Sequence, residues 1–190
     1  MPAFVALLRA VNLGGRNAVP MTALAELCGD LGLAEVKTVL QSGNVVFRSR
    51  SSDRGKLSSM LGDAIEKRCG FRPALFLRSH AELREVIAAN PFPQAAARDP
   101  GHLLVIFFDG KPAPGAAKAL SNHGRGPERV ELSGKNLYAW YTEGVGRSKL
   151  TNAFLEKALG QPGTGRNWNT VSKLEQICGA LEQKRSVAEE

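Results

Sequence analysis

The segment Thr164–Thr170 combines side chains that bind anions with a side chain that stacks on rings. Within seven residues it contains a guanidinium, an indole, and several carboxamides and hydroxyls, directly before an apolar-periodic helix. Arg166 suits bidentate binding of phosphate or carboxylate, and Trp168 suits stacking on a base or ring. Alternatively, Trp168 fills the junction between two halves of the chain, with Asn167 or Asn169 capping the helix. The segment is therefore either an anion-binding corner or a structural lock.

A second polar corner follows the first apolar run of the chain. Its members are Arg9, Asn12, Gly14, Gly15, Arg16 and Asn17. Glycines let backbone N–H groups turn toward a ligand, and a following helix start adds positive potential, so the corner suits an anion. The alternative is a glycine-rich turn whose asparagines only cap backbone groups. The run Gln41-Ser42-Gly43-Asn44 is a hairpin tip in which Asn44 is a further candidate contact, although such residues suit a turn on their own.

A third corner, Gly146-Arg147-Ser148-Lys149, stands at a predicted helix start. Ser148 suits the capping position, whereas Arg147 and Lys149 place two cations beside the free N–H groups. Cations there cost a few tenths of a kcal/mol, unless an anion pairs with them. That anion could be a ligand or a carboxylate of the same chain.

The hydrophobic periodicity predicts elements in two similar series. The first series is a strand at 4–11, a helix at 21–31, strands at 35–40 and 44–48, a helix at 51–69 and a strand at 73–77, followed by a short helix at 80–89. The second is a strand at 102–108, a helix from Pro112 or Pro114 to 121, strands at 129–132 and 136–141, and helices at 148–159 and 169–183. The order βαββαβ is that of ferredoxin-like folds, and its partial repetition suggests an internal duplication.

The predicted fold class is α+β, with two ferredoxin-like halves and a C-terminal helix. The Pro-rich run after Asn90 marks the boundary between the halves. We therefore expect an N-terminal half over 1–89, a linker over 90–101, a second half with the C-terminal helix over 102–183, and a frayed tail over 184–190.

Composition points to an ordinary globular protein with an excess of basic residues. The 190 residues are 43% hydrophobic and 23% charged, with a net charge of +7. A basic balance favours polyanionic partners such as nucleic acid or phosphorylated ligands. No run approaches the roughly 18 apolar residues of a membrane span, and the N-terminus does not resemble a signal peptide. We therefore expect a soluble cytoplasmic protein without a membrane partner. The three separated cysteines suit a core and not a disulfide framework.

No catalytic centre, metal site or cofactor site is predicted. The phosphate-binding loops Gly-x-x-x-x-Gly-Lys-Ser/Thr and Gly-x-Gly-x-x-Gly are absent, and so is the Gly-x-Ser-x-Gly elbow of hydrolases. His80, His102 and His123 do not have the spacing of metal ligands or of a catalytic triad. Tyr138 and Trp140 share one face of a predicted strand, which suits either base stacking or burial under a helix.

Five motifs resemble a bacterial family of proteins known as domain of unknown function 1697 (DUF1697). The matching runs are Leu8-Arg9-Ala10-Val11-Asn12-Leu13-Gly14-Gly15, Gln41-Ser42-Gly43-Asn44-Val45-Val46-Phe47, Ala89-Asn90-Pro91-Phe92, Gly146-Arg147-Ser148-Lys149-Leu150 and Thr164-Gly165-Arg166-Asn167-Trp168-Asn169-Thr170. They cover almost the whole chain. The resemblance implies an α+β protein with a ferredoxin-like N-terminal half and a related second half, and it implies no activity.

The leading hypothesis is a binding protein for an anionic ligand, either phosphate-bearing or nucleic acid, at a basic site between the two halves. Its candidate contacts are Arg9, Asn12, Asn44, Arg147, Ser148, Lys149, Arg166, Asn167 and Trp168. One alternative is a small enzyme that acts on a phosphorylated metabolite, with arginine and lysine as electrostatic stabilisers. The other is a non-catalytic interaction module whose polar motifs lock the two halves together.

Overall fold

The computed structural model describes residues 1–121 and 126–187, and these form two compact units. Unit 1 comprises Met1–Arg84 together with the chain from Lys173 onward, and unit 2 comprises Glu85–Ser172. His123, one of the three histidines considered from the sequence, lies outside the described residues. Among the described residues, none of the helices is long and apolar enough to cross a membrane.

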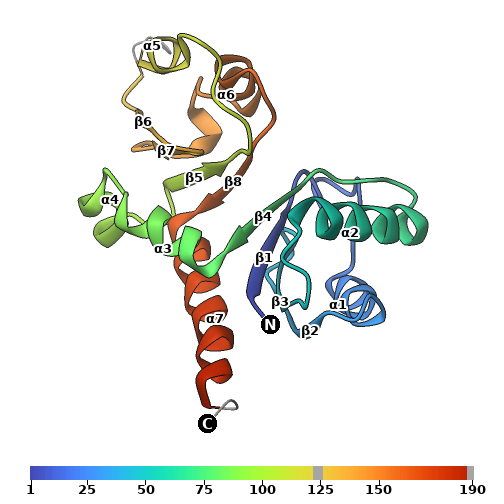
Figure 1. The fold of residues 1–190 in the computed structure, drawn as a ribbon. Helices are drawn as coiled ribbons and strands as arrows, with labels where there is room; N and C mark the ends of the chain where they lie inside the picture. Colours follow the sequence, from blue (N-terminus) through green and yellow to red (C-terminus); the bar gives the residue numbers. More distant parts are fainter. Residues whose placement is uncertain (122–125, 188–190) are drawn as a thin grey trace. The chain divides into compact units, whose positions relative to one another are not determined.

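Unit 1 contains a four-stranded antiparallel sheet with two helices on one face (Figure 1). Its elements are β1 (Ala3–Leu8), α1 (Met21–Asp30), β2 (Ala34–Val39), β3 (Asn44–Arg48), α2 (Arg54–Cys69), β4 (Leu75–Ser79) and the start of α3 (His80–Ala88). The strand order is β2-β3-β1-β4, so the apolar first strand lies inside the sheet. The C-terminal part of the last helix also belongs to this unit.

Local sequence explains the ends of α2 and the burial of β1. Asp53 caps α2 by accepting a hydrogen bond from the Lys56 N–H at 3.0 Å, and Gly70 ends the helix in the left-handed conformation. Every residue of β1 is buried, as expected for a strand covered on both faces. Phe4, Ala6 and Leu8 of β1 belong to the core cluster that α1 and α2 cover.

Two of the three cysteines have the buried position predicted for them. Cys28 and Cys178 are fully buried and Cys69 is partly exposed, and all three are free thiols. Burial raises the pKa of both the Cys28 and the Cys178 thiol to about 12. These two thiols are therefore small core residues.

Unit 2 contains a second four-stranded antiparallel sheet. Its elements after the end of α3 are α4 (Pro93–Arg98), β5 (Leu103–Phe107), α5 (Ala116–Ser121), β6 (Arg129–Ser133), β7 (Asn136–Trp140), the 3-10 turn η1 (Val145–Arg147), α6 (Asn152–Leu159), β8 (Thr164–Asn167) and the start of α7 (Trp168–Val187). The strand order is β6-β7-β5-β8, which matches that of unit 1 when the strands are numbered from the start of each unit. The α+β class is thereby confirmed.

Three segments of unit 2 differ from the sequence predictions. The run Thr164–Asn167, expected as an irregular corner, is the edge strand β8 and pairs with β5. A short helix, α4, begins at Pro93 within the expected linker. The helix expected from Ser148 begins at Asn152. The pairing of Thr164–Asn167 depends on β5, whereas the two helix starts have local causes, namely Pro93 in the first turn of α4 and the Thr151 cap of α6.

The two aromatic residues of β7 are used inside unit 2. Tyr138 is fully buried, its hydroxyl donates to the Val86 carbonyl at 2.6 Å, and burial raises its pKa to about 12. Trp140 is partly exposed, donates from Nε1 to Asp99 Oδ2 at 3.1 Å, and contacts the Phe92 ring at 6.3 Å. Of the two alternatives for Tyr138, base stacking or burial, the structure confirms burial.

We predict that Gly43→Ala lowers the free energy of unfolding by about 3 kcal/mol, because it combines left-handed strain with a steric clash. Gly43 has φ +73°, and an added Cβ would lie 2.4 Å from Val11 Cγ2 and 2.8 Å from Leu8 Cβ. Gly32→Ala is the matched control in the same unit, since Gly32 has φ +72° and open space around it. It should lose only about 1 kcal/mol. Urea unfolding followed by circular dichroism gives both values, and equal losses would contradict the clash.

Candidate functional site

Two loops of unit 1 meet at one end of its sheet. The first, residues 9–17, follows β1, and the second, residues 40–43, is the tip of the β2–β3 hairpin. The Asn12 side chain joins them by donating from Nδ2 to the Gln41 carbonyl at 2.7 Å. We call these two segments the paired loops. They contain the first polar corner and the hairpin tip that the sequence suggested separately.

Both the nitrogen and the oxygen of the Asn12 side-chain amide form hydrogen bonds that hold the paired loops. Besides the bond to Gln41, Nδ2 donates to the Val19 carbonyl at 3.0 Å, and Oδ1 accepts from the Val19 N–H at 2.8 Å. Its backbone has φ +56°, a conformation that asparagine adopts more readily than most residues. We therefore interpret Asn12 as a positioning residue and not as a ligand contact.

The paired loops concentrate left-handed backbone. Of the five non-glycine residues with positive φ in the described chain, four lie here: Ala10, Asn12, Asn17 and Leu40. Such conformations cost about 1–2 kcal/mol each for ordinary residues, so they persist only where the surroundings enforce them. Asn17 supports Ala10 by donating from Nδ2 to its carbonyl at 3.1 Å. Enforced strain of this kind clusters at binding sites, which makes the loops a candidate site.

The hairpin tip is fixed from below by two buried residues. Gly43 approaches β1 closely enough for its carbonyl to accept from the Leu8 N–H at 2.8 Å. Asn44 is fully buried, and its Nδ2 donates to the Val39 carbonyl at 2.8 Å and to Ser42 Oγ at 2.9 Å. Asn44, a predicted ligand contact, therefore closes the turn from inside.

The exposed side of the paired loops is positively charged. Residues 1–25 and 36–52, which include both loops, contain neither aspartate nor glutamate. Arg9 is half-buried, and Arg16 is exposed and makes no ion pair among the described residues. Gly14 and Gly15 are also exposed, and their N–H groups have no acceptor among the residues that the structure describes. Successive glycine N–H groups beside a guanidinium suit an anion.

Each loop also exposes one large apolar side chain. Leu13 is 63% exposed and Leu40 is 56% exposed. Single exposed leucines are ordinary on a protein surface. Here Leu13 directly precedes Gly14 and Gly15 in the chain, and Leu40 lies on the other of the paired loops. The loops thus offer apolar contact next to an anion-binding arrangement.

A family model described as "Protein of unknown function (DUF1697)" matches residues 1–138, more than half of the chain. The chain belongs to the DUF1697 family. The matched region includes the paired loops in full, together with most of the second sheet. The resemblance drawn from the sequence motifs is thereby confirmed.

One solved structure resembles this DUF1697 protein over nearly its whole length. It is described as the conserved bacterial protein SP0830 from Streptococcus pneumoniae. The two chains are 22% identical with a TM-score of 0.72, and the match covers 93% of this chain and 98% of the other. At this identity the likeness concerns the fold alone. None of the curated proteins matches the chain.

In unit 2 of the DUF1697 protein, Arg166 is buried. It lies on β8 opposite Val105 of β5 and is 7% exposed. Its Nη1 donates to Thr164 Oγ1 and to the Gly165 carbonyl, both at 2.8 Å, and burial lowers its pKa to about 10. These contacts favour a structural role within the edge strand.

Asn167 and Trp168 begin α7. Asn167 Oδ1 accepts hydrogen bonds from the Thr170 N–H at 3.0 Å and from Thr170 Oγ1 at 2.8 Å, so it caps the helix. Trp168 is 9% exposed, and its backbone N–H donates to the Pro100 carbonyl at 3.2 Å. Both residues therefore stabilise unit 2.

The third polar corner precedes α6 and does not form its cap. Thr151 caps α6 by accepting from the Phe154 N–H at 3.2 Å. Ser148 Oγ instead accepts from the Leu150 N–H at 2.9 Å, and Lys149 is exposed. The side chain of Arg147 lies outside the description. Lys149 is thus the predicted contact in this corner whose described side chain faces solvent.

The structure contains two histidine–carboxylate pairs that were not predicted from the sequence. His80 Nε2 lies 2.9 Å from Glu175 Oε1 in unit 1, and His102 Nδ1 lies 2.8 Å from Asp99 Oδ1 in unit 2. The first joins residues 95 positions apart, so no sequence spacing signals it. The second has a spacing of three and could have been noticed. No cluster of three or more His, Cys, Asp or Glu residues suited to a metal occurs in the described residues.

We predict that Asn12→Ala loosens the paired loops. Removing three hydrogen bonds should lower the free energy of unfolding by about 2 kcal/mol and speed amide exchange at Val19. Asn17→Ala is the matched control, since Asn17 also has positive φ but makes one exposed bond to Ala10. Hydrogen exchange measured by NMR, together with urea unfolding, distinguishes the two variants. Unchanged exchange at Val19 in Asn12→Ala would show that another contact holds the loops.

Proposed function

We propose that this DUF1697 protein binds a phosphate-bearing ligand, with nucleic acid the favoured class, at the paired loops of unit 1. One observation carries the proposal: two acid-free loops, held in an enforced conformation, contain the exposed Gly14 and Gly15 and, next to them in the chain, the exposed Arg16. Arg9 and Arg16 are the proposed contacts to phosphate. Asn12 and Asn44 position the loops that carry them.

The proposed binding combines a fork of guanidinium donors with backbone N–H groups. Arginine binds phosphate through two parallel hydrogen bonds, and such charge-assisted bonds are about twice as strong as neutral ones. Because the loops are already held by Asn12 and Gly43, little further conformational entropy is lost when the ligand binds. Leu13 and Leu40 would give apolar contact to a base, which favours a nucleotide over inorganic phosphate.

The charge of the whole chain supports the same class of ligand. A net charge of +7 attracts polyanions over distances of about a Debye length, roughly 10 Å at 0.1 M salt. The exposed Lys149 adds to this attraction from unit 2. Phosphate contacts of this kind give affinity without sequence preference, so we expect binding to depend on salt more than on base sequence.

We also propose that the two units are ferredoxin-like and descend from one duplicated unit. The two sheets share their strand order, and both central hairpins turn around Ser-Gly. Asn44 opposes Leu7 at the start of β3, and Asn136 opposes Phe107 at the start of β7. The same residue thus begins the corresponding strand at the corresponding register position in each unit.

We predict that the protein binds a fluorescein-labelled single-stranded 20-mer at low salt, and that Arg16→Ala weakens this binding. Loss of one phosphate contact should reduce the slope of log K against log salt by about 0.7. Arg50→Ala is the matched control, because Arg50 is also exposed and follows β3 at the opposite end of the same sheet. Fluorescence anisotropy from about 50 to 200 mM salt measures both variants.

Arg50→Ala should keep the affinity and the salt dependence of the wild type. Equal losses in the two arginine variants would mean diffuse attraction without a site at the paired loops. Contacts to phosphate are strongest at low salt. Absence of binding at about 50 mM salt would therefore exclude a nucleic-acid function.

The second candidate function, a small enzyme acting on a phosphorylated metabolite, has one observation in its favour. His80 and Glu175 line a hollow of about 380 Å³ in unit 1 together with Arg84. Gly179 leaves room for the imidazole, since a Cβ there would lie 2.8 Å from His80 Nε2. A histidine oriented by a carboxylate is an arrangement suited to a general base, and an arginine beside it suits a phosphoryl group.

If this second candidate is correct, the protein hydrolyses p-nitrophenyl phosphate and His80→Gln removes that activity. His80 would take the proton of the attacking water, and p-nitrophenolate would leave. His102→Gln, which changes the other carboxylate-paired histidine, should retain turnover. Release of p-nitrophenolate is followed by absorbance. Equal rates in wild type and His80→Gln would reject the enzyme.

A further inference from the structure

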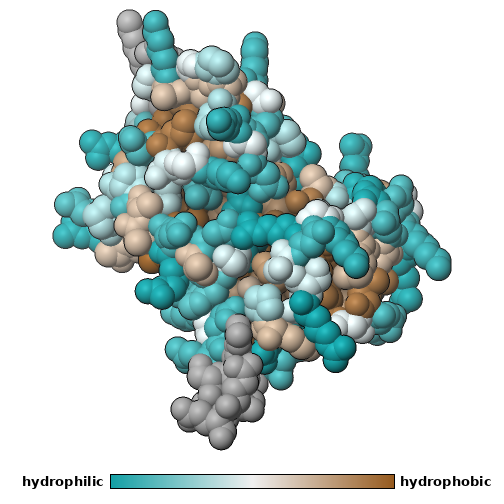
Figure 2. All heavy atoms as spheres, viewed as in Figure 1, coloured by the Kyte–Doolittle hydropathy of each residue, from teal (hydrophilic) through white to brown (hydrophobic). Residues whose placement is uncertain are grey.

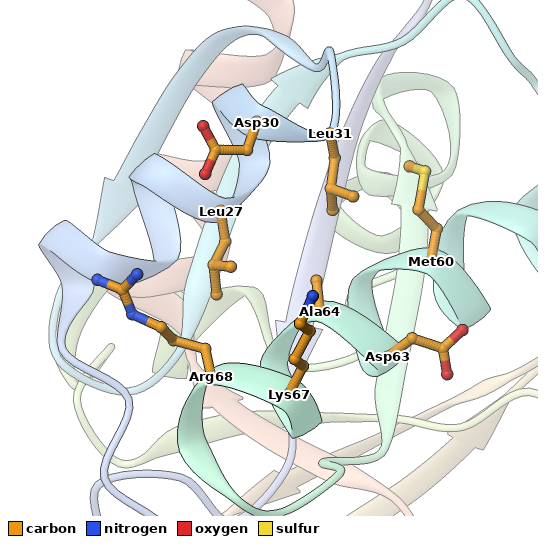
Figure 3. Close-up of a pocket in the computed structure, with 8 residues that line it drawn as sticks. All are labelled: Leu27, Asp30, Leu31, Met60, Asp63, Ala64, Lys67 and Arg68. Carbon is orange, nitrogen blue, oxygen red and sulfur yellow. The ribbon is translucent and has the colours of Figure 1, made fainter.

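Unit 1 has a hollow between α1 and α2 that shares no lining residue with the paired loops. Its volume is about 560 Å³, within the range of about 300–1,000 Å³ that is typical of small-molecule sites. Figure 3 shows Leu27 and Leu31 pointing from the α1 side toward α2, which carries Met60 and Ala64. We call this hollow the α1–α2 pocket.

The walls of the α1–α2 pocket are apolar and incompletely covered. Leu27, Leu31 and Met60 pack against the core of unit 1, yet each remains partly exposed. In Figure 2, hydrophobic residues reach the surface in the region of α1 and α2, among largely polar neighbours. Methionine adapts its shape to different occupants because its side chain is unbranched and flexible. The pocket therefore favours an apolar chain or ring.

The charged residues at the mouth leave one ammonium available. Asp63 is bound by Arg72, and Arg68 lies 3.4 Å from Glu26. Lys67 makes no ion pair in the part of the chain that the structure describes, and Figure 3 shows it extending along α2 toward the gap. The Asp30 carboxylate points away from the gap. Lys67 is therefore the cation that this pocket can offer to an acid group of an occupant.

We propose that the α1–α2 pocket binds an amphipathic organic anion. The hydrocarbon or ring packs against Leu27, Leu31 and Met60, and the acid group pairs with Lys67. This proposal uses neither the paired loops nor their arginines, so it stands or fails independently of the proposed function. Its chemistry differs as well, because it requires a long apolar body and one acid group where the paired loops require phosphate.

Dodecanoate below its micelle concentration is the probe, with the methionine methyl groups labelled with ¹³C. The chain has three methionines, and of these Met60 lines the pocket, whereas Met1 and Met21 do not. Titration should shift the Met60 methyl resonance in a saturable way and leave the other two nearly unchanged. Equal shifts of all three would mean non-specific adsorption and would overturn the proposal.

Two variants separate the charge from the cavity. Lys67→Gln should weaken dodecanoate binding about threefold, as expected for an exposed ion pair, and leave the binding of neutral dodecanol unchanged. Lys56→Gln, on the exposed first turn of the same helix, is the control and should have no effect. Ala64→Phe fills the pocket and should abolish the saturable Met60 shift, while circular dichroism checks that the helices are retained.

Three further results would reject the site. Equal effects of Lys67→Gln and Lys56→Gln would rule out a specific ion pair between Lys67 and the acid group of the probe. An unaltered Met60 titration in folded Ala64→Phe would place the probe elsewhere. A ligand-free dimer that Ala64→Phe dissociates, seen by size-exclusion chromatography, would make the groove a protein interface instead.

Discussion

The candidate site depends on Gly43, a position at which a residue with a side chain would not fit. Its carbonyl bonds to the Leu8 N–H, and its Cα approaches Leu8 and Val11 so closely that any Cβ would overlap them. This approach brings the hairpin tip against the end of β1, within reach of Asn12. Because protein interiors are dense and poorly compressible, a close contact in the core fixes the position of the loop attached to it. The conformation of an exposed loop is thus enforced by a contact inside the core.

The paired loops combine enforced backbone with an absence of acidic residues. Four non-glycine residues hold left-handed conformations there, at a cost that the surrounding hydrogen bonds must offset. The asparagines carry most of these bonds, and the exposed Arg16 and the Gly14 and Gly15 N–H groups take no part in them. The proposed division of labour, with amides that position the loops and cations that contact the ligand, accounts for the polar composition of these motifs. It also explains why Asn12 and Asn44 differ in role from Arg16, although all of them lie in or beside the same two loops.

The two units share a strand order but differ in what their prominent polar residues contact. In unit 1 the asparagines of the first loop and hairpin bond to backbone groups, and Gly14, Gly15 and Arg16 are exposed. In unit 2 the prominent polar residues make hydrogen bonds within the unit: Arg166 bonds along its own strand, and Asn167 caps α7. A buried guanidinium needs acceptors to offset its desolvation, and Thr164 and Gly165 supply two. The α1–α2 pocket and the hollow at His80 lie in unit 1, which therefore carries the sites argued above.

The sequence by itself determined the α+β class, the order of most strands and helices, and the family, since these follow from apolar periodicity and local motifs. It also located the paired loops, because glycine, asparagine and arginine at a strand end indicate a turn with free donors. Tertiary structure alone decided that Thr164–Asn167 is a strand, since its four residues carry no apolar alternation and β5 supplies the pairing. It alone buried Arg166 and brought His80 to Glu175 across 95 positions. Periodicity reports which face of an element is apolar. Which polar groups meet across long stretches of chain depends on the tertiary fold, and no local pattern encodes those pairs.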